Sequence, residues 1–177
     1  MSPLTMIWPA AEPLETARFL LEPVTEEHAA EMVEVLASPD LYRFTGGEPP
    51  TAQILQARYA RQSTGRSPDG GAGWLNWIIR TRATGQAIGF VQATLTGVNE
   101  ELAGELAWLI TPSAQRRGAA LESSAAVLVW LKGRHVRLVE ALIHPDHVAS
   151  ALVAQRLGLA ASSVRVNGET RWETTLL

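Results

Sequence analysis

The chain contains no cysteine, and only one of its 15 basic residues, Lys132, is a lysine. Without cysteine, disulfide bonds, thiolate metal sites and a cysteine nucleophile are excluded, and this composition suits a reducing compartment, so we expect a cytoplasmic location. No apolar stretch reaches membrane-spanning length, and no basic start precedes an apolar run, so we expect neither a membrane partner nor a secretory signal. The net charge of -3 argues against broad electrostatic binding of nucleic acid.

The composition is that of a globular protein, with 46% hydrophobic and 19% charged residues in a chain of 177. A chain of this length most simply forms one domain over residues 1–177. Residues 1–16 contain prolines and precede the first strand, so we expect them to be a loose N-terminal tail. A Gly-, Ser- and Pro-rich stretch at residues 63–73 predicts a loop.

Hydrophobic patterning predicts strands and helices in a mixed order. Strands are expected at residues 18–22, 74–82, 87–95, 105–110 and 137–143, with a final hairpin turning at Asn167-Gly168. Helices are expected at residues 26–36, 51–62, 118–132 and 147–157, the first two capped by Thr25 and Thr51. This order predicts an α+β (mixed α/β) fold with a mixed, mostly antiparallel sheet of about seven strands flanked by about four helices.

The segment "QRRGAA", Gln115 to Ala120, lies between a predicted strand and a predicted helix. Amide groups in the first helical turn have no intrahelical acceptor, and the helix dipole adds partial positive charge there. Gly118 permits close approach of an anion, and Arg116 and Arg117 add donors, which together match a diphosphate. The alternative on local physics alone is a polar loop before an ordinary helix.

Four blocks in order resemble one family, the GCN5-related N-acetyltransferases (GNAT), in its RimJ/RimL-like branch. "QRRGAA" fits the family's Q/R-x-x-G-x-G/A signature, and "GELAWLITPSAQRRGAALESSAAVL" resembles its cofactor strand and helix. The other blocks are "ETARFLLEPVTEEHAAEMVEVLASPD", "WIIRTRATGQAIGFVQATL" and "ALIHPDHVASALVAQRLGL". The resemblance implies direct transfer of an acetyl group from acetyl-CoA to a primary amine, of a protein N-terminus or of a small molecule.

The resemblance also implies which residues bind acetyl-CoA. The main chain of Leu109 and Ile110 is expected to contact the pantetheine arm and the thioester. The expected phosphate-binding residues are Gln115, Arg116, Arg117, Gly118, Ala119 and Ala120. His147 stands where many relatives have an asparagine that contacts the cofactor arm, so it is a further candidate donor.

Glu105 is the candidate general base, since it is an acid within an apolar strand, where burial raises a carboxyl pKa towards neutrality. The alternative is a structural glutamate at the sheet rim. Ser150 is the candidate proton donor to sulfur, and helix capping is its alternative. The tyrosine that serves many relatives as general acid is not evident, because the two tyrosines, Tyr42 and Tyr59, lie far upstream.

In the family the acceptor lies between the first two helices and the last hairpin, so Tyr42, Phe44 and Trp77 are the candidate acceptor-binding residues. Core packing is the alternative for tryptophan in a central strand. We expect no metal, since His144, Asp146 and His147 share a strand-to-helix turn that offers no obvious fourth ligand. A homodimer is the assembly considered.

Two other functions remain open at this point. One is a noncatalytic sensor that binds CoA or acetyl-CoA, in which the binding turn is kept and the acid–base pair is lost. The other is a nucleotide-binding enzyme, which is disfavoured because the chain has neither a G-x-G-x-x-G after a strand nor a G-x-x-x-x-G-K-[ST] motif.

Overall fold

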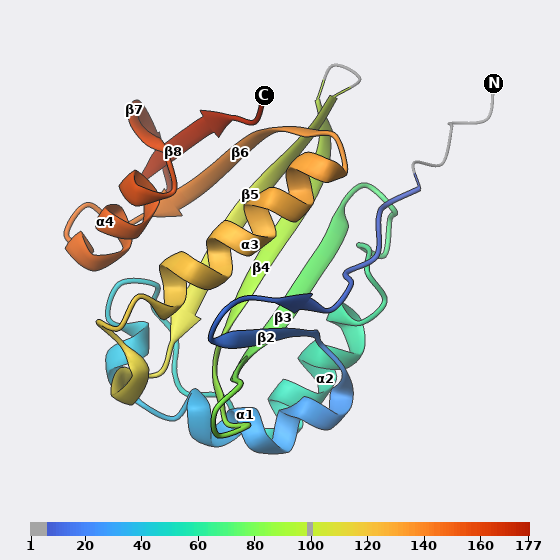
Figure 1. Cartoon of the computed structure of the whole chain (residues 1–177), viewed down its shortest axis with the longest axis vertical. Helices are drawn as coiled ribbons and strands as arrows, with labels where there is room; N and C mark the ends of the chain where they lie inside the picture. The colour runs from blue at the N-terminus through green and yellow to red at the C-terminus, as the bar shows by residue number, and fades with distance from the viewer. Residues whose placement is uncertain (1–6, 99–100) are drawn as a thin grey trace.

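A computed structural model of the chain describes residues 7–98 and 101–177 (Figure 1). The strands are β1 (Leu14–Glu15), β2 (Phe19–Pro23), β3 (Gly73–Thr81), β4 (Ala87–Val98), β5 (Glu101–Ile110), β6 (Val136–Ile143), β7 (Ala160–Val166) and β8 (Glu169–Thr175). The α-helices are α1 (Ala29–Val35), α2 (Ala52–Gln62), α3 (Ala119–Gly133) and α4 (Val148–Arg156). Short 3-10 helices are η1 (Glu26–His28), η2 (Pro39–Tyr42) and η3 (Pro112–Ala114).

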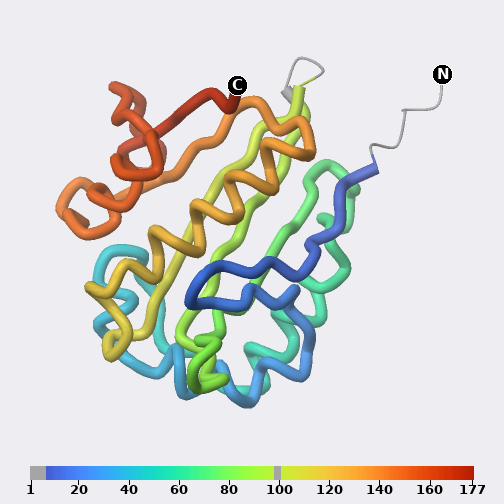
Figure 2. Tube along the Cα trace, in the orientation of Figure 1, coloured from blue at the N-terminus to red at the C-terminus, as the bar shows by residue number. Residues whose placement is uncertain are grey.

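The strands form one sheet in the order β1-β2-β3-β4-β5-β6-β8-β7. All neighbouring strands are antiparallel except β5 and β6, which are parallel because α3 connects them as a crossover. Figure 2 traces this crossover from the end of β5, along α3, to the start of β6. The sheet therefore has two antiparallel halves that meet at the β5–β6 pair.

Helices cover both faces of the sheet, and alternation along β3 shows how. Trp77 and Ile79 pack in the core that includes Val127 and Leu131 of α3, whereas Ile78 packs in a second core with α1 and α2. Successive side chains of a strand point to opposite faces, so α3 lies on one face and α1 and α2 lie on the other. Figure 1 shows α3 crossing the face nearer the viewer.

The start of α2 follows the predicted capping. The Thr51 hydroxyl accepts a hydrogen bond from the amide of Ile54 at 3.2 Å, which satisfies one of the free donors of the first turn. Thr25 also precedes a helical segment, and its amide donates to Nδ1 of His28 at 3.0 Å. That segment begins as the 3-10 turn η1 and becomes α-helical only at Ala29.

The N-terminal segment, predicted as a loose tail over residues 1–16, is described from residue 7 onwards. The Trp8 indole donates to the carbonyl of Gly70 at 3.0 Å, and the Trp77 indole donates to the carbonyl of Glu12 at 2.8 Å. Leu14 and Glu15 pair with β2 as the strand β1. Residues 8–15 are thus bonded to the sheet and to the loop before β3, and residues 1–6 lie outside the described part.

The predicted α+β fold, with a mixed and mostly antiparallel sheet flanked by four α-helices, is confirmed. The sheet has eight strands rather than about seven, because the two-residue β1 adds to the edge beside β2 and is too short to show a period. β5 starts at Glu101 instead of residue 105, because it pairs with β4 along its whole length. No helix in the described part of the chain is long and apolar enough to cross a membrane.

Candidate active site

The turn before α3 presents free backbone donors to solvent. Arg116 and Gly118 have positive φ angles of 61° and 76°, and α3 begins directly after Gly118. Glu122 is the first residue whose amide bonds within the helix, at 3.0 Å from the carbonyl of Gly118. The amides from Gly118 to Leu121 therefore have no intrahelical acceptor, and the exposed residues Arg116 and Arg117 directly precede them. This arrangement suits a phosphate anion.

Gln115 contributes differently from what the sequence predicted. Its side-chain Nε2 donates to the carbonyl of Ile110 at 2.8 Å, so the side chain closes the turn between β5 and α3. A larger residue at Gly118 would be strained, because its φ is 76° and an added Cβ atom would lie 3.2 Å from Nη2 of Arg18, which would have to shift slightly. Backbone amides, Arg116 and Arg117 are thus the groups of this turn that remain available to a ligand.

β5 and β6 separate in the direction of this turn. Their pairing runs from Leu102 with Val136 to Glu105 with Glu140, and residues 106–110 of β5 pair only with β4. The amide of Thr111 donates to the carbonyl of Ile88, so alternation directs the peptide groups of Ile110 and Trp108 away from β4 and into the open seam. Leu109, whose backbone was also predicted to bind the ligand, turns its peptide groups towards β4.

A cavity of about 100 Å³ lies at this seam. It is lined by Phe44, Thr45, Leu106, Ala107, Trp108, Ala141, Leu142, Ile143, His144, His147, Ser150 and Glu169. Three predicted residues, Phe44, His147 and Ser150, meet here, although they come from the loop before α2 and from the start of α4. An opening between separated strands, walled by a loop and a helix start, fits a thioester and an attacking group.

His147 lies between two other lining residues, with Phe44 on one side and Ser150 on the other. The rings of Phe44 and His147 stack with centroids 4.5 Å apart, and Nε2 of His147 lies 3.1 Å from the hydroxyl of Ser150. Burial, together with the nearby His144, lowers the pKa of His147, so its imidazole is neutral at pH 7. His147 is also the N-cap of α4, with Nδ1 accepting from the amide of Ser150 at 3.5 Å. Ser150 is therefore held by the cap rather than being the cap.

Glu105 lies where the β5–β6 pairing ends. Its neighbours across the sheet are Thr94 on one side and Glu140 on the other. Burial raises the pKa of the Glu105 carboxyl, the charges of Glu140 and Glu169 raise it further, and Arg171 acts in the opposite sense. Arg171 forms an ion pair with Glu140, in which Nε of Arg171 lies 3.2 Å from the Glu140 carboxylate. Glu105 is accessible to solvent and its pKa is raised, and both properties suit a proton acceptor.

Two predicted acceptor-binding residues lie elsewhere. Trp77 is fully buried on the α3 face, edge-to-face with Trp130 at 5.6 Å, because its strand position points away from α1 and α2. The Tyr42 hydroxyl donates to the carbonyl of Leu36 at 2.9 Å, and burial raises the pKa of this phenol. Phe44 alone of the predicted trio reaches the cavity.

Sequence reasoning missed Thr45, His144 and Glu169 as lining residues. His144 follows the end of β6 and was considered only as a metal ligand, and Glu169 opens β8 after the Asn167-Gly168 turn. The detectable signal for both was their place at strand ends on the side of the sheet where α4 begins. Among the described residues, no group of three or more His, Asp or Glu side chains is arranged to hold a metal ion.

Comparison with known proteins identifies the family of this chain. The sequence profile of the acetyltransferase (GNAT) domain matches residues 18–160, which is most of the chain, so the protein belongs to the GNAT family. None of the proteins with curated functions matches the sequence. The predicted family is confirmed.

Several solved structures share the fold. A GNAT-family acetyltransferase from Bacillus anthracis superposes with a TM-score of 0.75 at 13% identity, covering 93% of this chain and 98% of that one. A putative ribosomal-protein-serine acetyltransferase from Vibrio cholerae gives 0.71 at 17% identity, covering 96% and 99%. RimL, a ribosomal L7/L12 alpha-N-protein acetyltransferase solved with coenzyme A, gives 0.71 at 16%, covering 93% and 98%. RimL thus stands among the structures with this fold.

Proposed function

We propose that the protein transfers an acetyl group from acetyl-CoA to a primary amine by direct attack in a ternary complex. One observation supports the proposal: β5 and β6 separate after the Glu105–Glu140 pair, and the turn before α3 follows the end of β5. The cavity between the two strands begins at Leu106, next to Glu105, although Glu105 is not among the residues that line it. The chain thus passes in order the carboxylate of Glu105, the strand peptides that do not pair with β6, and the amide donors of the turn before α3.

The residues present fit acetyl-CoA. The amides of Gly118 to Leu121, with Arg116 and Arg117, suit the diphosphate, and the seam-facing peptide groups of β5 suit the amides of the pantetheine arm. When bound, acetyl-CoA supplies an activated acyl carbon and a thiolate leaving group. The backbone amide of Ile110 faces the seam and is a donor for the developing oxyanion.

The reaction needs two proton transfers, one from the amine and one to sulfur, and we assign them to Glu105 and Ser150. An amine is mostly protonated at neutral pH and loses one proton before its nitrogen bonds to the acyl carbon. Glu105 accepts that proton. When the carbon–sulfur bond broke, the attacking nitrogen would give up its second proton and the leaving thiolate would gain one. The hydroxyl of Ser150, which lines the cavity, would pass this proton on to sulfur. Neutral His147 orients this hydroxyl.

The acceptor is the amine of a protein N-terminus or of a small molecule. The likeness to the RimJ/RimL branch favours the N-terminal amine, and the RimL structure supports this choice. Phe44 and Thr45 at the mouth of the cavity are the residues proposed to contact the group that carries the amine. A cytoplasmic location and a homodimer stay predictions from the sequence.

The test is thiol release from acetyl-CoA over a panel of peptide and small-molecule amines, with Glu105→Gln and the matched control Glu140→Gln. We expect Glu105→Gln to lower kcat by about 10²–10⁴-fold while the Kd for CoA stays within about twofold. Glu140→Gln should remain active and shift the rise of the pH–rate profile to lower pH, because it removes a charge that raises the pKa of Glu105. Full activity of Glu105→Gln would remove Glu105 from the mechanism.

The second candidate function is the noncatalytic CoA sensor, which the placement of the tyrosines favours. Tyr42 is bonded to the backbone of Leu36, and the hydroxyl of Tyr59 is buried without a partner, with its pKa raised by burial to about 12. Neither phenol lines the seam cavity. CoA binding without thiol release for any amine of the panel would establish the sensor.

A further inference from the structure

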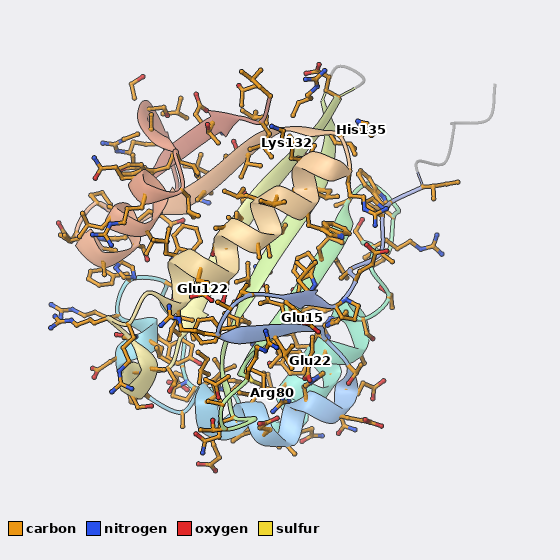
Figure 3. All side chains as sticks on the ribbon, in the orientation of Figure 1. Glu15, Glu22, Arg80, Glu122, Lys132 and His135 are labelled. Carbon is orange, nitrogen blue, oxygen red and sulfur yellow. The ribbon has the colours of Figure 1, made fainter. Side chains whose placement is uncertain are left out.

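Arg18 is distant in sequence from the turn before α3 but is hydrogen-bonded to it. Arg18 lies just before β2, and its guanidinium reaches the first turn of α3. Nε and Nη2 both lie 2.7 Å from Oε2 of Glu122, and Nη1 donates to the carbonyl of Arg117 at 2.7 Å. Figure 3 shows Glu122 at the start of α3, beside the strands of the N-terminal segment.

The other carboxylate oxygen of Glu122 is occupied from the same segment. Oε1 accepts the amide of Arg18 at 3.0 Å and the hydroxyl of Thr16 at 2.7 Å. Burial opposes ionisation, but the hydrogen bonds from Thr16 and Arg18 outweigh it and lower the pKa of Glu122. A carboxylate in the first turn of α3 would repel a diphosphate, and Arg18 compensates that charge at direct contact.

The bond to the Arg117 carbonyl fixes the direction of a donor. In a trans peptide the carbonyl of one residue and the amide of the next point in opposite directions. Because Arg18 holds the Arg117 carbonyl towards itself, the Gly118 amide points away from Arg18, out of the turn. The same guanidinium lies where a side chain at Gly118 would start, 3.2 Å from the ideal Cβ position.

We propose that Arg18 is a positioning residue for the phosphate groups of acetyl-CoA, acting through the Arg117–Gly118 peptide and through Glu122. This inference rests on the proposed function, since it takes the turn before α3 as the diphosphate site. Arg18 acts on the phosphate-bearing part of the ligand and leaves the acyl-transfer step untouched. Its loss therefore raises the KM for acetyl-CoA and not the barrier to transfer.

The experiment compares acetyl-CoA with S-acetyl-pantetheine, which carries the same thioester and arm without the diphosphate. For Arg18→Ala we expect the Kd for CoA and the KM for acetyl-CoA to rise by about 10-fold to 100-fold, with kcat at saturation and the turnover of S-acetyl-pantetheine within about twofold of wild type. The control is Arg82→Ala, because Arg82 bonds the β1–β2 turn that carries Arg18, at the carbonyl of Thr16, and has no hydrogen bond or ion pair to α3 among the described residues. This control should bind CoA as wild type does.

Arg18→Lys gives the same test with less risk to folding. A single ammonium keeps the charge beside Glu122 but cannot also hold the Arg117 carbonyl with a rigid fork, so we expect a loss of CoA affinity of several-fold and none for S-acetyl-pantetheine. Equal losses for both thioesters, or unchanged CoA binding in both variants, would overturn the role of Arg18 alone. A wild-type protein that binds no CoA would overturn the proposed function as well.

Discussion

Gly89, in β4 opposite the end of β5, offers a sharp test of how closely these two strands pack. A Cβ atom added at Gly89 would lie 2.0 Å from the carbonyl oxygen of Leu109, more than 1 Å inside van der Waals contact, and 3.0 Å from Cα of Ile110. Both obstacles are backbone, so no side-chain rotation relieves them. Gly89→Ala therefore forces the two strands apart beside the hydrogen bond from Thr111 to Ile88, which is 2.7 Å long.

We expect Gly89→Ala to lower the free energy of unfolding by about 1–3 kcal/mol or more, the usual cost of overpacking. For a protein of this size, each 1 kcal/mol corresponds to about 2–4 °C in Tm. The measurement is urea and thermal unfolding. The matched control is Gly104→Ala in β5, where the added atom meets only side-chain atoms, the nearest being Cδ2 of Leu95 at 3.3 Å. Equal stability of the two variants would refute the reasoning.

Three further predictions concern other parts of the molecule. Arg80 donates to Glu31 at 2.7 Å and to Glu22 at 3.0 Å (Figure 3 labels Arg80 and Glu22), and these bonds lower the pKa of both carboxyls below their ordinary 4.5. Arg80→Ala should therefore lose about 1–3 kcal/mol of unfolding free energy at pH 7, with the difference shrinking as both carboxylates protonate in acid; a difference in urea unfolding that is constant down to pH 3 would contradict this. Ser123 and Ser124 have fully buried hydroxyls without a hydrogen-bond partner, so each change to alanine should stabilise the protein by about 0.5–1 kcal/mol, and destabilisation in the same assay would show that the hydroxyls are paired. Phe44→Ala removes the ring stacked on His147 and should raise the KM for the amine about threefold to tenfold with CoA affinity unchanged, whereas a selective loss of CoA binding would place Phe44 on the other ligand.

Local chemistry was sufficient to predict much of the fold. The Asn167-Gly168 turn, the Thr51 cap and the glycine before α3 each depend on a few neighbouring residues, and the structure has all three where they were expected. Such features are readable because turn geometry and capping are decided within one or two turns of chain. The order of strands and helices followed from the hydrophobic patterning between such signals.

The site was harder to predict because it depends on which face a residue occupies. A shift of one position along a strand reverses the face, so Trp77 was assigned to the acceptor side although it packs under α3. Gln115 was assigned to phosphate although its amide bonds to Ile110, a contact that depends on how the turn closes. Glu169 and His144 come together because β6 and β8 pair with Ile143 opposite Thr170, and no local pattern encodes this pairing of separate strands.

The separation of β5 from β6 has a consequence for engineering. The β5 residues from Leu102 to Glu105 pair with β6 and so join the two halves of the sheet at one end only. Additional pairs between β5 and β6 would close the cavity between the two strands, and the loss of a pair would widen it. If the cavity between β5 and β6 holds the acyl group, we expect a change in strand pairing to alter acyl-chain preference without any change to the lining residues.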